Sequence, residues 1–182
     1  MKLWTVQTVE VLDKINSDGV YHCDPSRSVL LTEESFSHMF VPAYDWMAEQ
    51  MKKQIGPAPD GVRYPIWAYY MHRGRQKKPD LRCAEFIGKC YDEPPRVLIT
   101  LDIDPSRVLL SDMDKWTFVL NCWWLPPSDA TIEDKDKKIK LSWNNIFRMD
   151  SSRYVQATFW EIRREDVVHV EYPKRWNRGL TK

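Results

Sequence analysis

The chain has 182 residues with 27 basic and 26 acidic side chains, a formal net charge of +1, and an apolar fraction of 43%. This composition predicts one soluble globular domain over residues 1–182, and it excludes disorder for most of the length. Near-neutral charge argues against a protein that coats nucleic acid or an anionic membrane by bulk electrostatics, although it leaves a local basic patch open.

The N-terminal half alternates strand and helix patterns. Residues 3–6 form a strand-like run, and the apolar positions over 9–15 repeat at helical spacing until Gly19 ends the pattern. The stretch 35–55 predicts the longest helix, with a break at Pro42. The aromatic run 65–71 has the length of a strand and predicts burial on both faces.

The C-terminal half reads as paired strands around a helix. Strands are expected at 97–103 and 108–111, and Ser111 opens a capping-box pattern before a helix. That helix is predicted to turn four apolar residues toward the core: Trp116, Val119, Leu120 and Trp123. The mixed-charge stretch 129–140 predicts an exposed excursion or surface helix, and 155–162 and 167–172 predict a final strand pair. The order favours an α+β fold, a mixed or antiparallel sheet with flanking helices.

The cysteines indicate a reducing compartment. Cys23, Cys83, Cys90 and Cys122 include no CxxC pair, and charged residues interrupt the apolar positions near the N-terminus. We therefore expect a cytoplasmic protein with free thiols, no signal peptide and no membrane span. A zinc site from His72, Cys83 and Cys90 matches no standard spacing, so no metal is expected.

Familiar catalytic signatures are missing. The chain has no GxGxxG, P-loop, HExxH or GxSxG motif and holds six glycines in all. Standard Rossmann dehydrogenases, P-loop NTPases and zinc proteases are therefore poor candidates. Nine tryptophans are more than a core of this size needs, and large flat side chains also line sites that stack on rings.

Glu161 stands out by its place in an alternating strand. Val155, Ala157 and Phe159 form the apolar face of 155–162, and Glu161 is the next residue of that face. A carboxylate there must be paired or must reach a cleft, because an isolated buried charge is costly. The first alternative is an ion pair with a nearby arginine, and the second is a cleft carboxylate that stabilises positive charge.

The segment 72–82 carries five basic residues: Arg73, Arg75, Lys77, Lys78 and Arg82. With Gly and Pro in the same stretch, it predicts an exposed loop. It is either plain soluble surface or a contact for nucleic acid.

Several motifs resemble a bacterial and phage family known as the domain of unknown function DUF3841. They are WTVQ at 4–7, AYDWM at 43–47, PIWAYY at 65–70, LLSDMDKW at 109–116 and QATFWEI at 156–162. That resemblance spans nearly the whole chain and implies no activity.

Three segments also resemble small ADP-ribosyltransferases that modify DNA or RNA. They are 3–20, similar to the first strand and helix of those enzymes, 97–112, similar to their central strand, and 159–172, similar to their terminal strand pair. The resemblance implies an ADP-ribosyltransferase-like fold that uses NAD. It assigns Thr5 or Gln7 to the nicotinamide ribose or amide, Trp67 with Tyr69 or Tyr70 to stacking on the nicotinamide, and Glu161 to catalysis.

Two classes of function follow. The first is an NAD-dependent ADP-ribosyltransferase-like protein that modifies a nucleic-acid or protein acceptor. The second is a non-catalytic module that binds nucleic acid or protein through exposed aromatic and basic residues. Turnover of NAD separates the two.

Overall fold

The computed structural model describes residues 1–79, 95–123 and 135–172. Its strands are β1 (Lys2–Thr8), β2 (Val20–His22), β3 (Ile66–Met71), β4 (Arg96–Asp102), β5 (Leu109–Asp112), β6 (Val155–Phe159), β7 (Glu161–Arg163) and β8 (Val167–Glu171). Its α-helices are α1 (Val9–Asp18), α2 (Val29–Thr32), α3 (Glu34–Gln54), α4 (Met113–Leu120) and α5 (Lys135–Ser142). Short 3-10 turns include η3 (Trp143–Phe147) and η4 (Arg164–Asp166).

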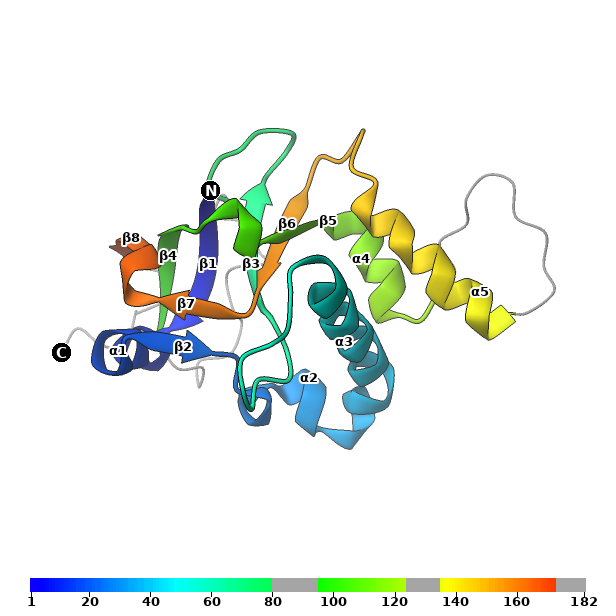
Figure 1. Cartoon of the computed structure of the whole chain (residues 1–182), viewed down its shortest axis with the longest axis horizontal. Helices are drawn as coiled ribbons and strands as arrows, with labels where there is room; N and C mark the ends of the chain where they lie inside the picture. Colours follow the sequence, from blue (N-terminus) through cyan, green and yellow to red (C-terminus); the bar gives the residue numbers. More distant parts are fainter. Residues whose placement is uncertain (80–94, 124–134, 173–182) are drawn as a thin grey trace.

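The strands form a six-stranded antiparallel sheet in the order β5-β6-β3-β1-β4-β8, and β2 and β7 make a separate two-stranded sheet. Figure 1 shows α1, β2 and β7 together at one end of the molecule and α3, α4 and α5 at the other. The predicted α+β class and antiparallel sheet are therefore confirmed.

Two hydrophobic clusters hold the layers together. The first joins the apolar face of β1 and β4 to α1, with Leu3, Leu12 and Ile99 fully or almost fully buried. The second lies against α3 and α4 and includes Met47 and Trp116. Alternate residues of each strand supply opposite faces, so the sheet separates the two clusters along β3 and β6.

Two predicted helices begin and end close to the expected residues. Gly19 ends α1 in the left-handed conformation at φ 82°, where a residue with a Cβ is strained. The longest helix is α3, which continues through Pro42 where the sequence predicts a break. Proline removes one backbone donor, and packing of Met47 and Met51 in the second cluster keeps the helix continuous.

The helix after β5 differs from the prediction at both ends. Its N-cap is Asp112, whose carboxylate accepts from the Lys115 backbone N–H at 2.9 Å, in place of Ser111. It ends at Leu120, and Cys122 adopts a positive φ of 53°. Trp123 therefore leaves the helical register, and its predicted place in the core is wrong: the residue is 57% exposed.

The predicted strand 155–162 is two strands in two sheets. β6 ends at Phe159, and β7 begins at Glu161 beside β2. Between them, Trp160 is buried in the second cluster, and its indole N–H donates to the Gly56 carbonyl at 3.1 Å. This bend breaks the two-residue alternation, so Glu161 does not continue the face of Phe159.

Candidate functional site

The six-stranded sheet opens between its two central strands. β1 pairs with β4 over seven residues, whereas its register with β3 holds only Trp4 opposite Tyr69. Beyond that pair, the Thr5 hydroxyl donates to the Trp67 carbonyl at 2.9 Å and replaces part of the ladder. Parted strands leave backbone donors and acceptors without strand partners, and such groups recognise polar ligands.

A pocket of about 270 Å³ lies at this opening. It is lined by Thr5, Val6, Tyr44, Trp67, Ala68, Tyr69, Met113, Trp116 and Gln156. None of these nine side chains is charged near neutral pH, because the only titratable groups among them are two phenols, which ionise near pH 10 in water. The pocket is therefore uncharged, and aromatic rings dominate its walls.

Three of the rings form one packed wall. The Trp67 and Trp116 ring centroids are 4.7 Å apart at an interplanar angle of 36°. Tyr44 meets both edge-on, at 5.8 Å from Trp67 and 6.1 Å from Trp116. Burial, together with the nearby Cys23 thiol, raises the pKa of Tyr44 to about 12, so the wall stays neutral at physiological pH. A wall of this kind favours flat or cationic ligands.

Thr5 and Gln7 act together on β1. The Gln7 side-chain amide donates to the Thr5 hydroxyl at 2.8 Å, while that hydroxyl donates onward to Trp67. Thr5 is 1% exposed, so its side chain is engaged in joining the strands. Gln7 supports Thr5 and is not among the residues that line the pocket.

Gln156 is the polar side chain at the far wall. It lies opposite Tyr69 on β3 and opposite Ser111 on β5, so three adjacent strands supply one polar row. Its amide N–H donates to the Ser111 hydroxyl at 3.2 Å, and Gln156 is only 7% exposed. The side-chain carbonyl accepts from no residue within the described part of the chain.

Tyr70 lies on the other side of β3 from Tyr69. Tyr70 packs against the first hydrophobic cluster with Leu3 and Ile66, whereas Trp67 belongs to the second. The sequence predicts that β3 is buried on both faces, and only one face is: Ile66 and Ala68 are buried there. On the other face Trp67 and Tyr69 are partly exposed, because the pocket opens along them.

Glu161 lies outside the pocket, in a charged cluster at the second sheet. Its carboxylate accepts from the Arg163 Nε at 2.6 Å, faces the His22 Nε2 at 3.1 Å and lies 3.7 Å from an Arg107 nitrogen. Partial burial opposes its ionisation, but the hydrogen bonds from Arg163 and His22 outweigh burial and lower the pKa of Glu161. Arg107 in turn binds both oxygens of buried Asp166, at 2.8 and 3.0 Å. This is the ion-paired arrangement that the sequence leaves open as its first alternative.

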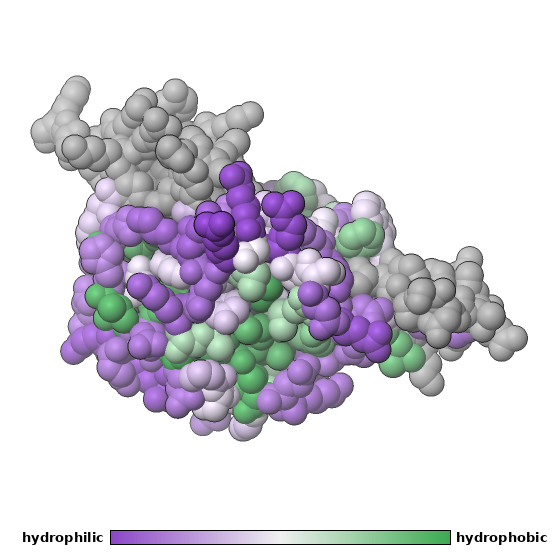
Figure 2. Space-filling model, turned by 90° about the horizontal axis from the view of Figure 1, so that it is seen from above, coloured by the Kyte–Doolittle hydropathy of each residue, from purple (hydrophilic) through white to green (hydrophobic). Residues whose placement is uncertain are grey.

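Four of the five predicted nucleic-acid contacts lie in the described part of the loop after β3. Arg73, Arg75, Lys77 and Lys78 are all exposed, and Arg82 lies outside the described residues. Lys78 pairs with Glu171 at 2.7 Å. Figure 2 looks down on this end of the molecule and shows strongly hydrophilic residues gathered beside a less polar area.

Six of the nine pocket residues are not among the site residues predicted from the sequence, and Tyr44, Trp116 and Gln156 are the largest polar or aromatic side chains of the six. Tyr44 and Trp116 read as ordinary core positions of helices, and only their convergence on β3 shows a second use. Gln156 lies on the opposite face of β6 from Ala157, so strand alternation predicts an outward polar residue there, and no local signal indicates its burial.

The described residues contain neither a cluster of metal ligands nor a helix that could span a membrane. Over residues 1–79, 95–123 and 135–172, no three His, Cys, Asp or Glu side chains gather as a metal centre would require. Cys23 and Cys122 are free thiols, and Cys83 and Cys90 lie outside those ranges. None of the described helices has both the length and the apolar character to cross a bilayer.

Comparison with known families finds one match. The family model for the domain of unknown function DUF3841 matches residues 2–135, which is most of the chain, and the protein therefore belongs to this family. The matched range contains every pocket residue except Gln156. No curated protein and no solved structure matches the chain.

Proposed function

We propose that this member of the DUF3841 family is an NAD-dependent ADP-ribosyltransferase-like protein that holds the nicotinamide ring of NAD in the pocket between β1 and β3. One observation carries the proposal. Thr5, Trp67 and Tyr69, which the transferase resemblance assigns to NAD, lie on two strands far apart in the chain and line the same pocket. β1 and β3 are neighbours in the sheet, and this pairing brings the three residues to one opening.

The size and chemistry of the pocket suit a single amide-bearing ring. Pockets for drug-sized molecules run from about 300 to 1,000 Å³, so about 270 Å³ accepts one ring system and leaves the rest of a dinucleotide outside. The aromatic wall favours a flat pyridinium, which carries positive charge in NAD. A carboxamide has a donor and an acceptor side by side, which backbone groups at parted strands can match.

The proposed reaction breaks the bond between the nicotinamide nitrogen and ribose C1′. The bonding electron pair stays on the ring nitrogen and neutralises the pyridinium, while a nucleophilic oxygen or nitrogen of the acceptor bonds to C1′ and loses its proton to solvent. Positive charge develops on the ribose during cleavage, so an oriented negative dipole lowers the barrier. In this proposal the Gln156 carbonyl oxygen supplies that dipole, because Glu161 is held by Arg163 and His22.

A second candidate is a binding module that holds the same ligand without turning it over. The absence of a carboxylate among the nine lining residues favours it, since an amide dipole stabilises an oxocarbenium ion less than a full negative charge does. Both candidates predict NAD binding, and they differ in the release of nicotinamide.

Two neighbouring tyrosines provide a matched test. NAD binding is measured by calorimetry, and nicotinamide release by chromatography, for Tyr69→Ala and for Tyr70→Ala. Tyr69 lines the pocket and Tyr70 does not, so we expect Tyr69→Ala to weaken NAD binding at least tenfold, or about 1.4 kcal/mol, and Tyr70→Ala to leave it unchanged once folding is verified. Equal effects of the two substitutions would refute the assignment of the pocket.

Gln156 separates turnover from binding. Gln156→Glu places a carboxyl group at the same position, and its ionised form should raise nicotinamide release if Gln156 faces the ribose. Gln156→Leu should abolish release and retain binding through the aromatic wall. Release from wild type at the background rate, with binding intact, would support the binding module over the transferase.

A further inference from the structure

The loop after β3 is a defined hairpin turn. His72 and Arg75 exchange backbone hydrogen bonds, at 2.9 Å and 3.3 Å, and the two residues between them have positive φ, 54° for Arg73 and 73° for Gly74. This is the conformation of a two-residue type I′ turn, which favours Asn or Gly at both central positions. An arginine in the left-handed region costs about 1–2 kcal/mol. Such local strain at a charged, exposed residue points to a use for that side chain.

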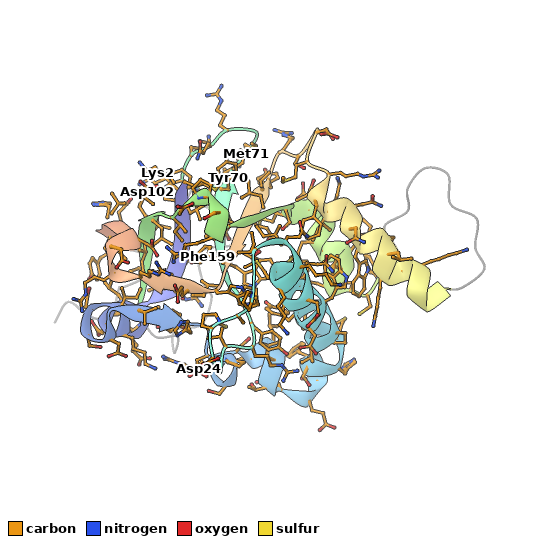
Figure 3. All side chains as sticks on the ribbon, in the orientation of Figure 1. Lys2, Asp24, Tyr70, Met71, Asp102 and Phe159 are labelled. Atoms are coloured by element: carbon orange, nitrogen blue, oxygen red, sulfur yellow. The ribbon has the colours of Figure 1, made fainter. Side chains whose placement is uncertain are left out.

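A second loop packs against this turn. The Gly74 backbone N–H donates to the Arg153 carbonyl at 2.7 Å, and the His72 ring meets the Tyr154 ring edge-on with centroids 5.2 Å apart. Residues 72–79 and 148–154, far apart in sequence, therefore form one surface. Figure 3 labels Tyr70 and Met71 at the end of β3 from which the turn leaves.

This surface carries more positive charge than the neighbouring carboxylates neutralise. Residues 72–79 hold four basic and no acidic side chains, and residues 148–154 hold Arg148, Arg153 and one acid, Asp150. In the described part of the chain, Lys78 alone of these cations has an ion-pair partner, Glu171. Exposed like charges that converge on a fixed turn repel one another, and a bound polyanion removes that repulsion.

The surface adjoins the pocket. Tyr69 and Gln156 line the pocket and lie three residues before His72 and two residues after Tyr154. Met113, also in the lining, donates its backbone N–H to the Tyr154 carbonyl at 3.0 Å. A chain of phosphates on the two loops therefore passes the end of the sheet where the pocket lies.

We propose that the two loops form a binding surface for single-stranded nucleic acid, with Arg73, Arg75 and Arg153 as phosphate contacts. The spread of cations over two loops suits several phosphates in a row better than the one pyrophosphate of a dinucleotide. A single strand can follow the turn and present unpaired bases toward the aromatic wall. The binding is independent of NAD, and only the further role of the strand as acceptor rests on the proposed function.

The test measures fluorescence anisotropy of a labelled single-stranded DNA of about 12 nucleotides, without NAD, from about 50 to 200 mM salt. The double variant Arg73→Asn/Arg75→Gln removes two cations, and asparagine relieves the strain of the turn. Each phosphate contact contributes about 0.7 to the slope of log K against log salt, so the variant should lower the slope by about 1.4 and the affinity about 25-fold at 0.1 M salt.

Matched controls decide the outcome. Lys14→Gln/Lys53→Gln removes two exposed cations from α1 and α3 and should leave affinity and slope unchanged. Arg153→Gln alone should also weaken binding, because Arg153 is the proposed phosphate contact on the second loop, which the hydrogen bond from Gly74 joins to the turn. Salt-independent binding, no binding, or equal losses in test and control variants would overturn the proposal. Loss of NAD binding in the Arg73/Arg75 variant, with the oligonucleotide unaffected, would also overturn it and assign the cations to the dinucleotide. Pocket variants should leave the salt slope unchanged, because the slope reports phosphate contacts alone, so the two proposals fail separately.

Discussion

Glu161→Gln distinguishes a structural carboxylate from a catalytic one. The substitution keeps the shape of the side chain and removes its charge. Glu161 has three basic neighbours, with Arg163 at 2.6 Å, His22 at 3.1 Å and Arg107 at 3.7 Å. Glutamine retains one acceptor oxygen and turns its amide group toward donors, so at least one charge-assisted hydrogen bond is lost.

The expected cost is about 1–2 kcal/mol of unfolding free energy at pH 7. A hydrogen bond to a charged group contributes about 1.5–3 kcal/mol, and the lower part of that range applies because the Arg163 side chain is 47% exposed and regains water. For a chain of about this length each kcal/mol shifts Tm by about 2–4 °C, so a decrease of about 2–8 °C is expected.

The pH dependence follows from the lowered pKa of Glu161. A carboxyl whose pKa is lower folded than unfolded stabilises the protein fully above the unfolded value, near 4.3, and loses that contribution as the pH falls through the folded value. The difference between wild type and Glu161→Gln should therefore be full at pH 7 and smaller at an acidic pH below the unfolded pKa.

The assay is thermal unfolding followed by circular dichroism at both pH values, with NAD binding and nicotinamide release measured at pH 7. The control is Glu165→Gln in η4, an exposed carboxylate without a direct ion pair in the described ranges, which should change stability by less than about 0.5 kcal/mol. Unchanged stability together with lost turnover would refute this reasoning and restore the catalytic assignment of Glu161.

Three further predictions concern the opening in the sheet and the end of α1, the helix that follows β1. Thr5→Val keeps the shape of the side chain but removes its hydrogen bond to Trp67, so NAD binding measured by calorimetry should weaken severalfold. Thr5→Ser keeps the hydroxyl and should bind NAD as wild type does, and equal binding by the two variants would show that the hydroxyl has no part in NAD binding. Absorbance titrations with base, compared between wild type and Tyr44→Phe, should show that the phenol lost in the variant has a pKa of about 12, and a pKa near 10 would contradict the burial of Tyr44. Gly19→Ala should lower the unfolding free energy by about 1 kcal/mol in urea titrations because φ is 82°, and an unchanged midpoint would show that the turn relaxes.

Much of the fold could be predicted from local pattern. Gly19 ends α1 where the helical spacing stops, and the strands around 66–71 and 97–102 appear with small shifts in their ends. These signals are local, because glycine supplies the left-handed conformation and apolar runs of this length favour strands.

The position of Glu161 could not be predicted in the same way. Every residue of β6 is buried on both faces, so the sequence alternation there carries no information about where the strand ends. The bend depends on Trp160 finding the Gly56 carbonyl, a contact between distant parts of the chain. The pattern of residues 155–162 therefore gives no sign that Trp160 pairs with Gly56.

The pocket was predicted in part. Thr5, Trp67 and Tyr69 line one pocket because β1 and β3 are neighbours in the sheet, and the contact with NAD that the resemblance assigns to them stays a prediction. Tyr44 and Trp116 were missed because helical spacing accounts fully for an apolar residue that faces a core. Their contribution to the wall is visible only when helix and sheet are docked.

The single pair between Trp4 and Tyr69 has a mechanical consequence. It divides the large sheet into two three-stranded plates, β8-β4-β1 and β3-β6-β5, each held by ladders of four or more residue pairs. A seam with one rung and one side-chain bridge bends more easily than either plate, so hydrogen exchange should separate protected amides within the plates from faster ones along the seam. A ligand that bonds to both edges would act as the missing rungs and stiffen the molecule across its full width.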